Sequence, residues 1–101
     1  NQKTQHIGVV GAGAMGQGIA QVATQAQAQV LVFDVVAGAA DKACAAVRGQ
    51  WQKLQEKGRL TAEQVQDFSS RLKAAEHLHD LAPCHVVIEA VVENLTVKKA
   101  L

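Results

Sequence analysis

Three short runs along the chain are almost entirely apolar and rich in β-branched residues. They are residues 6–11 (HIGVVG), 28–34 (AQVLVFD) and 84–91 (CHVVIEAV). Unbroken apolar runs of this length are typical of strands that are buried on both faces of a parallel sheet. Residues 71–76 (RLKAAE) provide a further short strand. The pattern therefore predicts a sheet of four strands.

The segment between the first two apolar runs has the periodicity of an amphipathic helix from Ala14 to about Ala26. Apolar side chains recur there at spacings of three and four, at Met15, Ile19, Val22 and Ala26. Glutamines occupy the other side of this helix. We therefore expect the apolar stripe to be the face that packs on the sheet.

Three more helices follow from the same kind of pattern. The second predicted helix covers about residues 37–57, and the third covers residues 62–70. Thr61 and Gln64 have the spacing of a capping box at the start of the third helix. Asn94 is placed to cap a last helix, which runs to the end of the chain.

This order of elements defines the expected fold class. Strands alternating with helices are typical of a doubly wound α/β unit with a parallel sheet, a Rossmann-type fold, and right-handed crossovers predict the strand order 3-2-1-4. A chain of 101 residues forms at most one domain. Ligands bind such sheets at the carboxyl ends of the strands, where the strand order reverses, so we expect the site between strands 1 and 4.

A glycine motif lies at the turn from the first strand to the first helix. Gly11, Gly13 and Gly16 fit the pattern G-x-G-x-x-G. In a dinucleotide-binding fold the first glycine permits the tight turn, the second lets a pyrophosphate approach the backbone, and the third lets helix and strand pack closely. Free N–H groups near Ala14 and Met15 would then point at the phosphates. A glycine-rich turn that serves only close packing is the alternative.

Asp34 adds a second part to this motif. It ends the second strand, 18 residues after Gly16, where an acidic side chain accepts hydrogen bonds from the adenosine ribose. A carboxylate there repels a 2′-phosphate, and Val35 and Val36 supply no arginine to bind one. The predicted cofactor is therefore NAD rather than NADP. The alternative for Asp34 is a plain helix N-cap.

The composition argues against two classes of function. The net charge is +1 and only 3% of the residues are aromatic, so the sequence shows no basic or aromatic surface for binding nucleic acid or an acidic membrane. Cys44 and Cys84 lie far apart in the sequence, which favours two reduced thiols. No run is long enough to span a bilayer, and the polar start is no signal peptide. We expect a soluble cytoplasmic protein.

The histidines give no metal signature. His77 and His79 flank Leu78, with Asp80 beside them. Residues two apart do not share a helix face, and no second cluster of ligands accompanies them. We therefore expect solvated turn residues here and no metal site.

The segments IGVVGAGAMGQGIAQVA, VLVFD and VIEAVVENLTVKKAL resemble the NAD-binding half of the L-3-hydroxyacyl-CoA dehydrogenases, the β-oxidation enzymes. The resemblance covers essentially the whole chain and is closer to the stand-alone bacterial enzymes, including those of phenylacetate degradation and 3-hydroxybutyryl-CoA metabolism. It implies hydride transfer from a (S)-3-hydroxyacyl-CoA to NAD, giving the 3-ketoacyl-CoA.

The same resemblance implies that residues 1–101 are an N-terminal dinucleotide-binding domain fragment. The family's catalytic His and Glu, and the helical domain through which its members dimerise, belong to sequence beyond this segment. We therefore assign no catalytic residue in this chain and expect it to be inactive alone, although the parent enzyme is expected to be a homodimer. The sheet edge at residues 84–91 and apolar helix faces are expected to be exposed, which predicts self-association.

The resemblance also assigns residues to ligands. The cofactor-binding positions are Gly11, Ala12, Gly13, Ala14, Met15, Gly16, Asp34, Val35, Ala90, Val91, Glu93 and Lys98. Glu93 and Lys98 are expected on the nicotinamide side, with Lys98 one turn into the last helix; a solvated acid and lysine are the alternative. Lys53 or Lys57 is expected to contact the phosphates of coenzyme A.

Two other interpretations of the function stay open. The chain could belong to another β-hydroxyacid dehydrogenase, such as a 6-phosphogluconate relative, which shares this half-fold. It could also be a stand-alone NAD-binding module without catalytic activity.

The end of the first helix departs from the family pattern. The family commonly has glycine there, where this chain has Gln27. A left-handed residue other than glycine costs about 1 kcal/mol, so we expect this helix end to fray or to be rebuilt.

Overall fold

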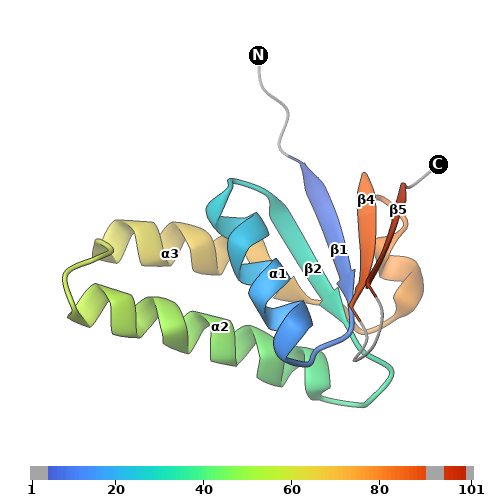
Figure 1. Ribbon diagram of the computed structural model, residues 1–101, viewed down its shortest axis with the longest axis horizontal. Helices are drawn as coiled ribbons and strands as arrows, with labels where there is room; N and C mark the ends of the chain where they lie inside the picture. Colours follow the sequence, from blue (N-terminus) through green and yellow to red (C-terminus); the bar gives the residue numbers. More distant parts are fainter. Residues whose placement is uncertain (1–4, 91–94, 100–101) are drawn as a thin grey trace.

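The computed structural model, which describes residues 5–90 and 95–99, contains one five-stranded sheet with the order β3-β2-β1-β4-β5 (Figure 1). The strands are β1 (His6–Val10), β2 (Gln29–Phe33), β3 (Leu72–Ala74), β4 (Val86–Ala90) and β5 (Leu95–Lys99). The first four are parallel to one another. The predicted α/β class and the order 3-2-1-4 are therefore confirmed.

The fifth strand contradicts two expectations. Residues 95–99 form β5, antiparallel to β4, in place of the helix predicted after Asn94. The segment Leu95–Lys99 contains the β-branched residues Thr96 and Val97, which favour strands, and the free edge of β4 offers it hydrogen-bonding partners. Because β5 pairs with that edge, the expectation of an exposed edge at β4 is wrong, while self-association itself stays a prediction.

In the part of the chain that the structure describes, four helical segments connect the strands. They are α1 (Ala14–Gln25), α2 (Ala39–Glu56), α3 (Ala62–Arg71) and the short 3₁₀ helix η1 (Leu78–Leu81). Figure 1 shows α1, α2 and α3 on one side of the sheet and η1 on the other. Within residues 5–90 and 95–99, no helix combines the length and apolar character needed to cross a membrane.

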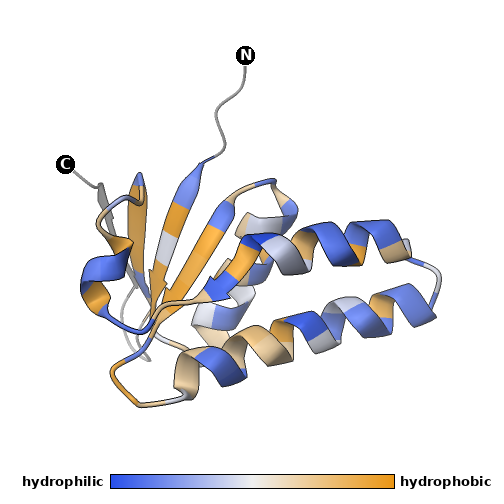
Figure 2. Ribbon diagram, turned by 180° about the vertical axis from the view of Figure 1, so that it is seen from behind, coloured by the Kyte–Doolittle hydropathy of each residue, from blue (hydrophilic) through white to orange (hydrophobic). Residues whose placement is uncertain are grey.

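Adjacent residues of β1 show how the two faces are covered. Val9 is fully buried and faces α1, because a Cβ on Gly16 would lie 3.5 Å from Val9 Cγ1. Gly8 points to the opposite face, where Leu81 and Cys84 fill the space next to it. The strands that carry this core are the most apolar part of the ribbon (Figure 2).

The face of α1 that packs on the sheet differs from the predicted one. Val22 is 70% exposed and Met15 is 43% exposed, whereas Gly16, Ala20 and Thr24 are buried. These three residues are small and four apart, so they let the helix axis approach the sheet closely. Thr24 satisfies its buried hydroxyl by donating to the Ala20 carbonyl at 2.7 Å. Of the predicted stripe, Ile19 does pack against the core. The prediction was wrong for Met15 and Val22 because it ranked positions by hydropathy, while side-chain size decides this contact.

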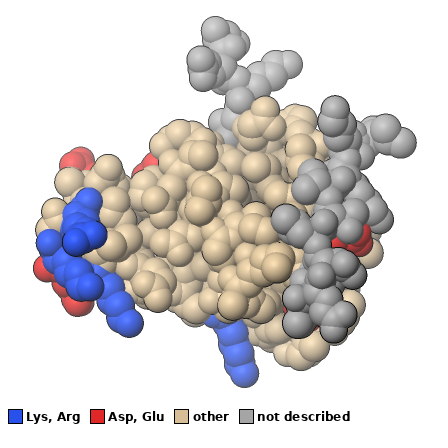
Figure 3. Space-filling view, viewed as in Figure 1, with Lys and Arg blue, Asp and Glu red and all other residues tan. Residues whose placement is uncertain are grey.

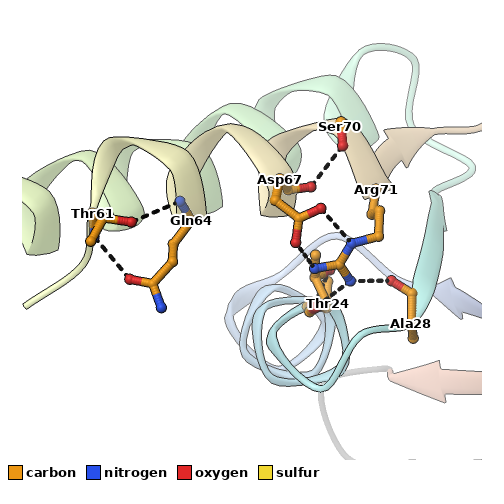
Figure 4. Close-up of polar contacts among 8 residues, drawn as sticks. Thr24, Ala28, Thr61, Gln64, Asp67, Ser70 and Arg71 are labelled. Atoms are coloured by element: carbon orange, nitrogen blue, oxygen red, sulfur yellow. Dashed lines mark hydrogen bonds and ion pairs between the residues drawn. The ribbon is translucent and has the colours of Figure 1, made fainter.

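Specific side chains fix the start and the inner face of α3. Thr61 Oγ1 accepts a hydrogen bond from the Gln64 N–H, and Gln64 Oε1 accepts one from the Thr61 N–H, so the predicted capping box is confirmed (Figure 4). The Trp51 ring, which is fully buried, packs 5.3 Å from the Phe68 ring of this helix. The capping box and the aromatic pair therefore fix both the start and the inner face of α3.

Arg71, at the end of α3, joins three parts of the fold (Figure 4). Its side chain is 9% exposed. Nη1 donates to the carbonyls of Thr24, at 2.6 Å, and Ala28, at 3.0 Å. Nη2 lies 2.7 Å from Asp67 Oδ2, and this hydrogen bond lowers the pKa of Asp67. The guanidinium thus ties the end of α1 and the start of β2 to α3.

The end of α1 is intact, although Gln27 has a φ of +79°. The Gln27 N–H donates to the Thr24 carbonyl at 3.0 Å, and the Ala28 N–H donates to the Ala23 carbonyl at 3.1 Å. These two bonds form a Schellman motif, which normally has glycine in the left-handed position. The expectation of fraying was wrong because Arg71 binds the carbonyls on both sides of Gln27 and holds the turn.

Replacing Gln27 by glycine is expected to raise the free energy of unfolding by about 1 kcal/mol, because it removes the cost of a left-handed side chain. The matched control is Gly58→Gln, since Gly58 has a φ of +78° at the end of α2 and already avoids that cost. This control should lose a similar amount. Urea denaturation of both variants checks the pair, and equal destabilisation by both would contradict the expectation.

Candidate dinucleotide-binding site

A cavity of about 450 Å³ lies at the carboxyl ends of β1, β2 and β4. Seven residues line it, all of them predicted cofactor positions: Gly11, Ala12, Gly13, Ala14, Met15, Asp34 and Ala90. The cavity is at the point where the strand order reverses, which is the place expected for a ligand in this kind of sheet. Backbone and small side chains form most of its wall.

Gly11 is required by the protein's own backbone. Its φ is +114°, and a Cβ there would lie 2.2 Å from the carbonyl oxygen of Ala90. Its N–H donates to the carbonyl of Phe33 at 2.8 Å. Gly11 therefore permits the turn after β1 and brings the loop against the ends of both neighbouring strands.

Gly16 is required by the packing of the loop against α1. A Cβ on Gly16 would lie 1.9 Å from the carbonyl oxygen of Gly11, far inside contact distance. Its absence lets the first turn of α1 fit directly behind the loop. Gly16 therefore has the predicted role of letting the helix pack closely against the end of the first strand.

No contact with the described residues requires a glycine at Gly13. It is the N-cap residue of α1 with a φ of −76° and a ψ of −170°, a conformation that any residue adopts. Among the residues that the structure describes, a Cβ added to Gly13 would meet no atom within 4 Å. Gly13 lines the cavity, so an added side chain would take up space that a ligand needs.

Asp34 connects the glycine loop to the end of β2. Its Oδ2 accepts a hydrogen bond from the N–H of Ala12 at 2.8 Å, and its Oδ1 accepts one from the N–H of Val36 at 2.8 Å. The N-cap of α2 is Gly38, so the alternative of Asp34 as a plain helix cap is wrong. The carboxylate is fixed at the cavity wall, where each oxygen can accept a further hydrogen bond.

A second cavity of about 300 Å³ shares Asp34 with the first. Two more carboxylates line it, those of Asp41 and Glu76. Neither residue was predicted from the sequence, because Asp41 is seven residues beyond Asp34 and Glu76 follows a different strand. Three acidic side chains around one cavity favour a neutral or positively charged group over a phosphate.

Some predicted site residues lie elsewhere. Val35 is 87% exposed and lines neither of these two cavities. Lys98 belongs to β5, where it pairs with Val87, so its predicted place in a helix is wrong. Val91 and Glu93 lie outside the described residues.

Lys53 and Lys57 are both at the end of α2. That end is the one farther from the glycine loop (Figure 1). Figure 3 shows most Lys and Arg side chains of this face gathered where α2 turns into α3, with acidic residues among them. Their assignment to the phosphates of coenzyme A stays a prediction.

The histidine pair is closer together than its spacing suggested. The rings of His77 and His79 stack with centroids 5.1 Å apart. Among the residues that the structure describes, no group of three or more His, Cys, Asp or Glu side chains could hold a metal ion.

Both cysteines, Cys44 and Cys84, are free and buried. Burial raises the pKa of each side chain, which keeps both as thiols.

The parallel sheet, the glycine turn at its switch point and the acid at the end of β2 define a class of protein, the dinucleotide-binding α/β domains. Residues 6–101 match the family described as 3-hydroxyacyl-CoA dehydrogenase, NAD binding domain. The chain belongs to this family, as its resemblance predicted, and the family's description confirms NAD as the cofactor.

Similar proteins come from several bacteria. The 3-hydroxybutyryl-CoA dehydrogenase of Bradyrhizobium diazoefficiens is 42% identical over 93 residues, which are 92% of this chain and 32% of that protein. The 3-hydroxyadipyl-CoA dehydrogenase of Escherichia coli is 40% identical over 97 residues, which are 96% of this chain and 20% of that protein.

A solved structure shows the same arrangement. The crystal structure of (S)-3-hydroxybutyryl-CoA dehydrogenase from Ralstonia eutropha superimposes with a TM-score of 0.83 at 34% identity, covering 91% of this chain and 32% of that one. The chain therefore spans about a fifth to a third of the length of these relatives.

Proposed function

We propose that this chain is the NAD-binding part of an oxidoreductase that converts a (S)-3-hydroxyacyl-CoA to the 3-ketoacyl-CoA. NAD supplies the acceptor for the hydride that leaves the C3 carbon of the substrate. The hydroxyl proton passes to a general base, which we place in the part of the parent enzyme that lies outside this chain. Family membership favours this activity over that of a 6-phosphogluconate relative.

The observation that carries the proposal is the empty space at Gly13. The fold requires glycine at Gly11 and Gly16, but nothing in the described residues 5–90 and 95–99 requires it at Gly13. We place the pyrophosphate of NAD against this backbone, where the N–H groups at the start of α1 and the helix dipole favour negative charge. Ala14 and Met15, in that first helical turn, also line the cavity.

The acidic cavity supports the preference for NAD. Asp34 is placed to accept hydrogen bonds from the adenosine ribose, and Asp41 and Glu76 add negative charge beside it. A 2′-phosphate in this position would face three carboxylates, so NADP binding is disfavoured electrostatically.

Ala90 lines the cavity, and we propose that it contacts the cofactor together with Val91. The remaining assignments rest on the family resemblance: Glu93 lies toward the nicotinamide, and Lys53 or Lys57 contacts the phosphates of coenzyme A. Lys98 is not assigned to the nicotinamide, because it pairs with Val87, three residues before Ala90 in β4. A cytoplasmic parent enzyme fits this assignment, because both cysteines are free thiols. That the parent enzyme is a homodimer is proposed from the family resemblance. Short acyl-CoA substrates are favoured by the names of the relatives.

Gly13→Ala is expected to raise the Kd for NAD by about 10-fold to 100-fold, the equivalent of one lost charge-assisted hydrogen bond. Its melting temperature should fall by only a few degrees, because the added Cβ meets no described atom and the only loss is the preference of an N-cap for glycine over alanine. Isothermal titration with NAD measures the affinity. The matched control is Gly49→Ala in α2, where a Cβ also meets no atom within 4 Å, and its Kd should equal that of the unmodified chain.

NADP is the second ligand in this experiment, and it should bind more weakly than NAD to the unmodified chain. An unchanged NAD affinity in Gly13→Ala, or tighter binding of NADP than of NAD, would contradict the proposed site. Because binding is measured without substrate, the result does not depend on the catalytic residues of the parent enzyme.

A further inference from the structure

Ala12 lies in the centre of the glycine loop, and side chains bind both of its backbone polar groups. Its N–H donates to Asp34 Oδ2 at 2.8 Å. Its carbonyl accepts a hydrogen bond from Gln17 Nε2 at 3.1 Å. These two side chains come from different elements, the end of β2 and the first turns of α1. Ala12 is therefore held from two sides before any ligand is bound.

The contact with Gln17 follows from helix geometry. Gln17 is the fourth residue of α1, and its N–H donates to the carbonyl of the N-cap Gly13 at 2.9 Å. Helical side chains lean toward the N-terminus, so the fourth residue reaches the residue that precedes the N-cap, here Ala12. Apolar pairs at these two positions are known to fix the chain's entry into a helix. Gln17 makes a polar contact of the same kind.

This loop needs such a restraint. Ala12 has glycine on both sides, and glycine gains more conformational freedom than any other residue when it is not held. A loop that samples many conformations must lose that freedom when the pyrophosphate binds, which weakens affinity. Fixing Ala12 fixes the direction of the peptide groups on both sides of it.

We propose that Gln17 is a positioning residue that, together with Asp34, holds the glycine loop in its binding conformation. The inference rests on the proposed function for its consequence, which is tighter binding of the pyrophosphate. Gln17 is not among the residues that line the cavity, and its amide is occupied by the Ala12 carbonyl. It therefore acts on the cofactor through the loop, whereas Asp34 also faces the cavity directly.

The test compares Gln17→Met, which keeps the length of the side chain but removes the amide donor, with Gln21→Met one turn further along α1. Amide hydrogen exchange of Ala12, measured by NMR without ligand, should be about fivefold faster in Gln17→Met, as expected for the loss of one neutral hydrogen bond. Gln21→Met should leave this rate unchanged.

Titrations then separate positioning from a general loss of structure. The Kd for NAD and for ADP-ribose should rise about fivefold in Gln17→Met, whereas the Kd for adenosine, which has no pyrophosphate, should stay the same. An unchanged exchange rate at Ala12 overturns the proposal, as does an equal loss of affinity for adenosine. If the unmodified chain binds no NAD, the proposed function fails, while the exchange rate still decides whether Gln17 holds the loop.

Discussion

Gly16→Ala is expected to destabilise the chain by about 3 kcal/mol and to abolish NAD binding. The new Cβ would lie 1.9 Å from the carbonyl oxygen of Gly11, which belongs to the backbone and cannot rotate away. The first turn of α1 must therefore move off the loop, and overpacking of this kind costs about 1 to 3 kcal/mol or more. The same movement displaces the N–H groups that face the cavity.

Gly18→Ala provides the control for this experiment. Gly18 lies two residues further along the same helix, and a Cβ there would meet no atom within 4 Å. Alanine stabilises a helix interior relative to glycine by about 0.5 to 1 kcal/mol, so this variant should gain stability and bind NAD normally. Urea denaturation and NAD titration measure both effects. A Gly16→Ala chain that is as stable as Gly18→Ala would refute the packing argument.

The second large effect is expected from Arg71→Met, which should lose about 2 to 4 kcal/mol of stability. Methionine preserves most of the volume of the arginine stem, so little packing is lost. The carbonyls of Thr24 and Ala28, however, lose the guanidinium that donates to them. An unsatisfied buried polar group costs about 1 to 3 kcal/mol. Thermal and urea denaturation measure the loss.

Arg59→Met is the matched control, because Arg59 is exposed in the connection between α2 and α3. Its stability should stay within about 0.5 kcal/mol of the unmodified chain. Equal effects of the two substitutions would show that Arg71 contributes no more than a surface charge.

Asp67→Asn separates the ion pair from the carbonyl contacts of Arg71. The hydrogen bond from Arg71 lowers the pKa of Asp67 below its ordinary value of 3.8. The carboxylate therefore contributes its full stabilisation above that value and loses it as the pH falls through the lower pKa of the folded state. The stability difference between the unmodified chain and Asp67→Asn should shrink below about pH 4.

The sequence predicted the site because its parts are local and are brought together by one topology. The glycine motif fixes a turn within six residues, and Asp34 ends the next strand. Once the strands are parallel and adjacent, both must lie at the same edge of the sheet. Seven predicted positions line one cavity for this reason.

The features that the sequence did not reveal depend on distant partners. The buried face of α1 follows from the need for small residues at Gly16, Ala20 and Thr24, which hydropathy does not detect. The intact turn at Gln27 depends on Arg71, 44 positions later in the chain. Such contacts can be predicted only once the positions of the helices and strands relative to one another are known.

Gly11, Gly13 and Gly16 form one motif in the sequence, yet the structure constrains them differently. A descendant of this protein that had lost its cofactor would still need the outer two glycines in order to fold. At Gly13 any small side chain could then accumulate without harm. Substitution at this middle position alone is therefore a marker by which ligand-free descendants could be distinguished from functional ones by comparing sequences.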